Sequence, residues 1–208
     1  MNTLKESNKV TLSGIISSDF RFSHEVFGEK FYLVDFDVKR KSDATDTVPL
    51  MISERLIDVT YDYKGCPAKV VGALRSYNVH DNGRTHLKIY VFVQDISEVF
   101  DDREDENNVS IIGFICKEPI YRKTPLGREV ADVMIAINRP YGKSDYIPCL
   151  AWGRNAGYMS KLEVGTQLSL DGRIQSRIYD KRLENGEHEL RTAYEVSLSR
   201  FKVLGANR

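Results

Sequence analysis

The sequence predicts an all-β protein made of two five-stranded barrels in tandem, with one short helix in each. Three observations lead to this prediction. The chain repeats itself at an offset of 99 to 100 residues, apolar and polar residues alternate along most of each repeat, and one helical segment interrupts the strands. A length of 208 residues suits two such units, because small domains commonly have about 100 residues.

The repeat begins with the first expected strand. The motif Val-x-Leu-x-Gly that ends at Gly14 returns as Val-x-Ile-x-Gly ending at Gly113. A second motif, two glycines separated by six residues, spans residues 65–72 and returns at residues 165–172. The chain is therefore interpreted as a duplicated domain.

The two copies are assigned to residues 1–100 (the first repeat) and 107–208 (the second repeat). Residues 101–106, Asp-Asp-Arg-Glu-Asp-Glu, are typical of a solvated acidic linker. The whole chain has zero net charge, but the second repeat carries 16 Lys and Arg against 11 Asp and Glu. Such an imbalance favours contact between one half and a polyanion.

In the second repeat we expect one helix, at residues 155–162, ended by Gly165. The expected strands lie near residues 107–116, 129–138, 146–153, 167–179 and 190–203. Five strands with a helix between the third and fourth have the order of an oligonucleotide-binding (OB) barrel. A barrel of this kind suits an extended ligand that lies across its face.

The strand expected near residues 146–153 is the most informative one. Alternation places Tyr146 and Trp152, the only tryptophan, on the same face of this strand. A platform on which bases stack is one interpretation of the two rings. A place in the core is the other, since large aromatic residues are highly buried on average.

Four motifs follow one another along residues 107–204: N-x-V-x-x-x-G, R-x-T-P-x-G, A-W-G-R and G-x6-G-R-x-Q-S-R-x-Y. In this order and spacing they resemble the bacterial single-stranded DNA-binding proteins. The resemblance implies binding of single-stranded DNA without sequence preference, in replication, recombination or repair. It also implies that bases stack on aromatic residues while Lys and Arg contact phosphates.

The resemblance assigns the site residues as well. The aromatic platforms of the family fall on Tyr141, Tyr146, Trp152 and Tyr179. The basic residues expected along the bound strand are Arg122, Lys123, Arg139, Lys143, Arg154, Arg173, Arg177 and Lys181. For any single one of these cations, a solvated surface charge is the alternative interpretation.

The first repeat lacks the platforms, because Ser42, Thr47, Ser53 and Val79 stand at the corresponding positions. A barrel therefore does not need those aromatic residues to fold, which favours a ligand role for them in the second repeat. We expect the first repeat to keep the barrel and to have lost most of the binding. Its own aromatic residues are interpreted as core or interface residues: Phe31, Tyr32, Phe36, Tyr77 and Tyr90. The basic cluster at residues 39–41 is a solvated loop or a phosphate contact.

No catalytic or metal-binding pattern is present in the sequence. The histidines and the three cysteines show no ligand spacing, and no phosphate-cradling glycine loop occurs. We therefore expect a non-enzymatic protein with no cofactor and no metal. The sequence contains no run of about 18 apolar residues, so we expect no membrane-spanning helix. We expect a soluble, cytoplasmic, nucleoid-associated protein.

The resemblance implies single-stranded DNA as the main partner, with replication and repair proteins as possible further partners. Because the family usually assembles four barrels, a homodimer of this chain is expected to supply them. The usual acidic tail is absent, which puts tail-mediated recruitment in doubt. The alternative function is an OB-fold interaction module, or primosome-type adaptor, with weak nucleic-acid binding. Near-neutral charge and the loss of platforms in the first repeat favour it, and RNA binding by the same surface is a third interpretation.

Overall fold

The computed structural model describes residues 7–40, 42–81, 84–98, 106–182 and 186–206. The strands of the first repeat are β1 (Asn8–Ile16), β2 (Arg21–Val26), β3 (Glu29–Lys39), β4 (Thr45–Ser53), β5 (Pro67–Asp81) and β6 (Arg84–Glu98). Those of the second repeat are β7 (Asn107–Ile115), β8 (Ile120–Lys123), β9 (Glu129–Asn138), β10 (Ser144–Trp152), β11 (Thr166–Arg182) and β12 (His188–Ala206). A 3-10 turn, η1 (Pro140–Gly142), precedes β10, and the helix α1 (Arg154–Met159) follows it.

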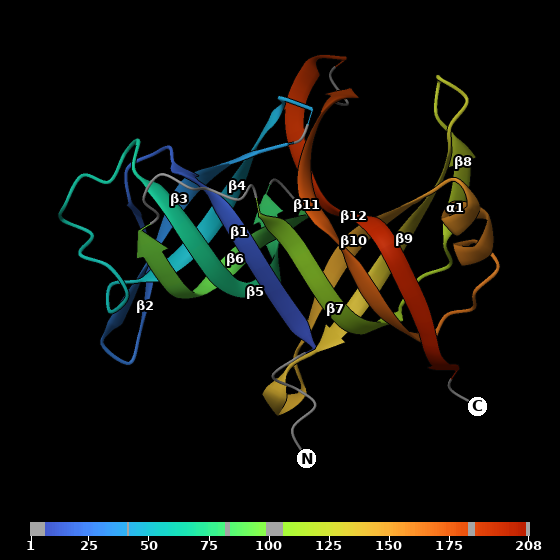
Figure 1. Ribbon diagram of the computed structural model, residues 1–208, viewed down its shortest axis with the longest axis horizontal. Coiled ribbons are helices and arrows are strands. Elements are labelled where there is room, and N and C mark those ends of the chain that lie inside the picture. The colour runs from blue at the N-terminus through green and yellow to red at the C-terminus, as the bar shows by residue number, and fades with distance from the viewer. Residues whose placement is uncertain (1–6, 41, 82–83, 99–105, 183–185, 207–208) are drawn as a thin grey trace.

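Each repeat closes into a five-stranded barrel (Figure 1). In the first, the order β3-β4-β6-β5-β1 returns to β3 through a short pairing of β1 with β3. In the second, the order β9-β10-β12-β11-β7 returns to β9 in the same way. The strands β2 and β8 extend β3 and β9 outside the closed rings. This order confirms the prediction of two tandem OB barrels.

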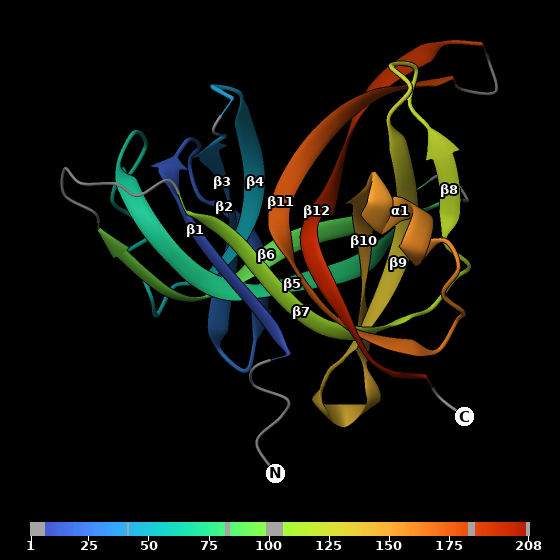
Figure 2. The same ribbon diagram turned by 45° about the vertical axis from the view of Figure 1, so that its right-hand side comes forward.

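The two barrels are joined along β1 and β7, which pair in antiparallel fashion and lie side by side in Figure 2. The contacts beside this pairing are the same on both sides. The side-chain amide of Asn8 exchanges two hydrogen bonds with the backbone of Leu74, and that of Asn107 does so with the backbone of Ile174. The seam between the repeats therefore has approximate twofold symmetry.

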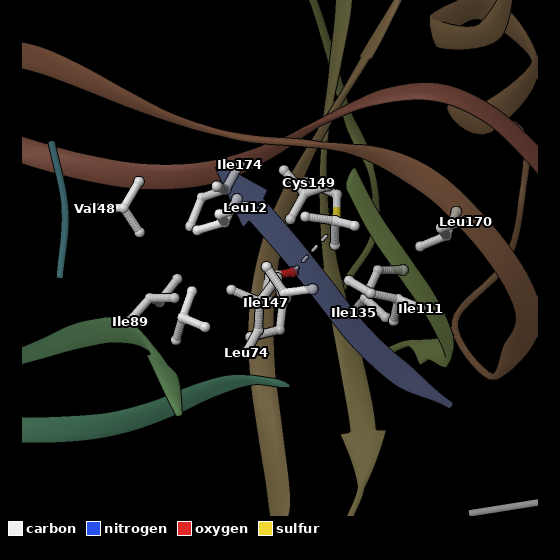
Figure 3. Packing of buried hydrophobic residues seen from close by; sticks show 14 of the residues in the cluster. Leu12, Val48, Leu74, Ile89, Ile111, Ile135, Ile147, Cys149, Leu170 and Ile174 are labelled. Atoms are coloured by element: carbon white, nitrogen blue, oxygen red, sulfur yellow. Dashed lines mark hydrogen bonds between the residues drawn. The ribbon is translucent and has the colours of Figure 1, made fainter. Parts of the chain in front are cut away.

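Alternating apolar residues of the strands fill both barrels in one continuous buried cluster (Figure 3). Leu12 and Leu74 belong to the first barrel, and Ile111 and Ile147 to the second; all four are inaccessible to solvent. Each such side chain contributes about 1.5–3 kcal/mol on burial. The thiol of Cys149 lies in the same cluster, where burial raises its pKa well above the ordinary value. The core thus holds the strands of both barrels together.

The repeated glycines allow one strand to approach another closely. A β-carbon on Gly72 would stand 2.3 Å from the carbonyl oxygen of Phe92, and one on Gly172 would stand 2.4 Å from that of Ser197. Both positions coincide with a shift of register between the long paired strands. The motif at an offset of 100 residues therefore marks equivalent β-bulges.

The expected helix forms in the second repeat but not in the first. In α1, Ala156 and Met159 are buried against the barrel. The corresponding residues 54–66 form turns instead. There the carboxylate of Asp58 accepts hydrogen bonds from the backbone N–H and the hydroxyl of Thr60. Such local bonds compete with helix formation.

The predicted acidic linker lies mostly outside the described residues, of which only Glu106 belongs to it. The carbonyl oxygen of Glu106 accepts a hydrogen bond of 2.8 Å from the backbone of Ser13. Its carboxylate lies 2.7 Å from the ammonium group of Lys69. The end of this segment is therefore held against the first barrel.

Candidate nucleic-acid interface

Tyr146 and Trp152 lie on the outer face of the second barrel, which runs across β8, β9, β10, β12 and β11. Residues paired on neighbouring strands point to the same side of a sheet. Trp152 pairs with Val130 and Val130 pairs with Arg122, so these three side chains form one row. In the next row along β10, Leu150 pairs with Asp132.

The indole of Trp152 is held in place from the other side of β10. Its Nε1–H donates a hydrogen bond of 3.0 Å to the hydroxyl of Ser197 on β12. The side chain is partly exposed. Its neighbours on the adjacent strands are smaller than the indole: Val130, which pairs with it on β9, and Ser197, its hydrogen-bond partner on β12. Ser197 in turn pairs with Arg173 on β11. The ring is thus anchored by its edge on a sheet surface that carries a cation nearby.

The outer face continues along β11 into a long arm formed with β12. The arm and the hairpin of β8 and β9 rise from the same end of the barrel (Figures 1 and 2). Arg177, Tyr179 and Lys181 alternate on the side of the arm that also carries Arg173. The guanidinium of Arg177 lies 5.5 Å from the centre of the Tyr179 ring, a cation–π arrangement.

Tyr146 stands at the opposite end of β10 and is 45% exposed. Its backbone N–H donates a hydrogen bond of 2.8 Å to the hydroxyl of Ser76 in the first repeat. The first barrel therefore supports β10, the strand that carries Tyr146 and Trp152. Tyr141 lies in η1, and its side chain is outside the described part of the structure.

Asp132 and Glu195 partly neutralise the positive charge of the outer face. Arg122 donates hydrogen bonds to Asp132, the shorter of 2.6 Å, and this bonding raises the pKa of the guanidinium. Arg177 lies 4.0 Å from Glu195, a pair that we call the Arg177–Glu195 pair. Both arginines remain about half exposed and keep hydrogen-bond donors for a phosphate.

Four of the eight predicted cations thus lie on the outer face, Arg122 at its β8 edge and Arg173, Arg177 and Lys181 along β11. The other four lie elsewhere. Lys123 points to the opposite side of β8, Lys143 follows η1, and Arg154 opens α1, all three exposed. Arg139 lies 3.0 Å from the buried carboxylate of Asp145 at the seam.

Two buried carboxylates at the seam have functions that the sequence reasoning missed. Asp46 is inaccessible to solvent, and it accepts hydrogen bonds from the backbone N–H and the hydroxyl of Ser176, at 2.7 and 2.9 Å. Arg40 donates to the same carboxylate and also to the carbonyl oxygen of Ser176. This group locks the arm of the second barrel onto β4 of the first.

Asp145 repeats the arrangement from the other side. It accepts from the backbone N–H of Ser76 at 2.7 Å and from Arg75 at 3.0 Å. The signal in the sequence was the repeat itself, because Asp46 and Asp145 are 99 residues apart and their serine partners are 100 residues apart.

Residues 106–204 match the model of the Single-strand binding protein family. The second repeat is therefore similar to that family over nearly its whole length. The match covers the second barrel up to residue 204, near the end of β12, and includes its outer face. Among the described residues, no group of His, Cys, Asp and Glu is arranged to hold a metal ion, and no helix is long and apolar enough to cross a bilayer.

Individual proteins are similar over part of the chain. A single-stranded DNA-binding protein of Halalkalibacterium halodurans is 36% identical over 81 residues, which are 36% of this chain and 48% of that protein. Single-stranded DNA-binding protein 1 of Lactococcus lactis is 29% identical over 109 residues, 49% of this chain and 70% of that protein. The chain thus spans about half the length of the first of these relatives.

A solved structure is similar over both barrels. The wild-type single-stranded DNA binding protein from Thermus aquaticus superimposes with a TM-score of 0.73, over 97% of this chain and 94% of that chain. The sequence identity is 19%, so the similarity shows the tandem-barrel fold.

Proposed function

We propose that this protein binds single-stranded DNA without sequence preference on the outer face of the second barrel. The observation that carries the proposal is the position of Tyr146, Trp152 and Tyr179 on one continuous face with Arg173 and Arg177. The match of residues 106–204 to the Single-strand binding protein family supports the same function.

Each part of the face has a physical task in this proposal. Every base has a π-face, so stacking on an aromatic ring tolerates any sequence and contributes about 1–3 kcal/mol per base. Trp152 is well suited because the hydrogen bond to Ser197 fixes the ring before a base arrives. Arg173, Arg177 and Lys181 lie along β11 and contact the phosphates of the bound DNA strand in this proposal.

We further propose a non-enzymatic role in replication, recombination or repair, in the cytoplasm at the nucleoid. Two chains would form a homodimer with four barrels, and replication or repair proteins are further partners. The approximate symmetry of the seam supports this assembly, because the two barrels of one chain already pack as equivalent units.

Binding is expected to weaken steeply with salt. Four cations lie along the proposed path, and counterion release from single strands gives a slope of about −0.7 per phosphate contact. The affinity for a labelled oligo(dT) should therefore fall with a slope of about −3 in a plot of log K against log salt. Fluorescence anisotropy over a range of salt concentrations measures this slope.

The double variant Arg173→Gln, Arg177→Gln should lower the slope by about 1.4, whereas Lys161→Gln, beyond α1, should leave it unchanged. A slope near zero in the parent, or equal affinity for duplex DNA, would contradict the proposal. Stronger competition by RNA oligonucleotides would shift the assignment to RNA.

A further inference from the structure

The outer face of the first barrel carries a row of aromatic rings that was not expected from its missing platforms. The row runs from the β2 edge of the barrel to the long hairpin of β5 and β6, and it consists of His24, Phe31, Phe92, Tyr90 and Tyr77. His24 stacks on Phe31 with the ring centres 5.1 Å apart and an angle of 12° between the planes. The centres of Phe31 and Phe92 are 5.8 Å apart, and those of Tyr77 and Tyr90 are 5.6 Å apart. Tyr90 and Phe92 alternate on β6, so they share one side of the sheet.

One half of this row replaces the tryptophan of the second barrel. Ser53 stands where the second barrel has Trp152, and Ser53 pairs with Phe31 on β3. Phe92 lies on the other side of β4, opposite Met51. In the second barrel, the large ring of Trp152 on the central strand β10 lies between Val130 and Ser197. In the first barrel, the small Ser53 on the central strand β4 lies between the large rings of Phe31 and Phe92. The aromatic rings of the first barrel therefore lie on β3 and β6, the two strands beside the central strand β4.

The other half of the row replaces the second platform in the same manner. Thr47 corresponds to Tyr146 and offers no ring. The strands beside it carry Tyr77 and Tyr90, where the second barrel has the Arg177–Glu195 pair. The first barrel therefore keeps stacking surface at both ends of its central strand.

The row is accessible to solvent, and cations lie at the end of the row formed by β5 and β6. His24 is exposed, and Tyr77 is 43% exposed. Lys88, exposed on β6, pairs with Tyr77 and points to the same side. Arg75, paired with Tyr90, shares the single carboxylate of Asp145 with a second arginine, which leaves a net positive charge beside the row. Rings flanked by cations are the chemistry that binds single-stranded nucleic acid.

We propose that the first barrel is a second single-strand-binding face, on which bases stack along the row from Tyr77 to His24 and phosphates contact Lys88 and Arg75. The inference rests on the proposed function of the second barrel, since it extends the same ligand to the first. The face binds by rings on β3, β5 and β6 in place of rings on the central strand.

A relocated indole tests the proposal directly. In the double variant Trp152→Phe, Tyr77→Trp, the only indole stands on the row of the first barrel. Its emission should fall when a single-stranded oligonucleotide of about 30 nucleotides is added, long enough for two faces with site sizes of about 4–16 nucleotides each. Separate titrations with oligo(dT) and oligo(rU) show whether DNA or RNA is bound more tightly.

The matched control is Trp152→Phe, Tyr61→Trp, because Tyr61 is an exposed tyrosine of the first repeat outside the row. Its emission should not change. As a second measurement, Tyr77→Ala added to the variant Tyr146→Ala, Trp152→Ala should lower the remaining affinity for oligo(dT) by about 5- to 150-fold. Tyr77→Phe should retain that affinity.

Unchanged emission from Tyr77→Trp at a saturating concentration, with binding verified by anisotropy, would overturn this inference and leave the row as a surface for another protein. The proposed function would survive that result, because emission from Trp152 in the parent reports on the second barrel alone. Failure of the parent to bind any oligonucleotide would instead overturn the proposed function.

Discussion

Replacing Tyr146 and Trp152 together with alanine is expected to lower the affinity for single-stranded DNA by about 30-fold or more, because each lost ring would remove about 1–3 kcal/mol of base stacking. The two rings lie at opposite ends of one strand and share its outer side. Neither belongs to the core, since Tyr146 is 45% exposed and Trp152 is partly exposed. The loss should therefore appear in binding with little change in unfolding.

Fluorescence anisotropy with labelled oligo(dT) measures the affinity, and thermal unfolding checks the fold. The conservative variant Tyr146→Phe, Trp152→Phe should bind nearly as the parent does, because it keeps both rings. Tyr158→Ala is the matched control, since Tyr158 is 55% exposed on α1 and packs on Phe201 away from the outer face. An alanine double variant with the affinity of the parent would refute the stacking assignment.

Replacing Asp46 with alanine should destabilise the protein by about 3–5 kcal/mol, because removal of one partner of a buried ion pair leaves the other uncompensated. The change removes the hydrogen bonds from Arg40 and those from the backbone and hydroxyl of Ser176. Urea unfolding measures the free energy. Asp95→Ala is the control, since this exposed carboxylate on β6 should cost less than about 0.5 kcal/mol.

The contribution of Asp46 should also depend on pH. Burial acts to raise the pKa of this carboxyl, but the hydrogen bonds from Arg40 and Ser176 together outweigh it and hold the pKa below the ordinary value. A carboxyl whose pKa is lowered by folding stabilises the fold above its unfolded pKa of about 3.9, and this contribution is lost as the pH falls through the folded pKa. The difference in stability between the parent and Asp46→Asn should therefore shrink between pH 6 and pH 3. A difference that stays constant or grows over this range would contradict the assignment.

The strands of the second repeat could be predicted closely because each has a buried side. The strand expected at residues 129–138 is β9, and the one expected at residues 146–153 begins two residues earlier, at Ser144. The strand β8 was missed, since all four of its residues are exposed and leave no alternating pattern. The helix expected in the first repeat is absent because a local Asp58–Thr60 turn replaces it.

The candidate site could be predicted only in part. Alternation and the family resemblance indicated Tyr146 and Trp152, because period-two patterns carry information about one strand. Whether rings on different strands meet depends on register, and this was beyond the reach of a single sequence. The sequence therefore predicts only that Phe31 and Tyr77 are core or interface residues and gives no sign that both belong to one aromatic row.

The emission of Trp152 is the most direct test of the central claim that single strands stack on the second barrel. Trp152 is the only tryptophan of the chain, so the parent protein carries one reporter at the proposed site. The measurement is a titration with an oligo(dT) of about 8 nucleotides, within the site size of one OB fold, with anisotropy recorded in parallel. Emission is expected to fall in step with binding. Unchanged emission at saturation, with the oligonucleotide bound, would show that the strand lies elsewhere on the molecule.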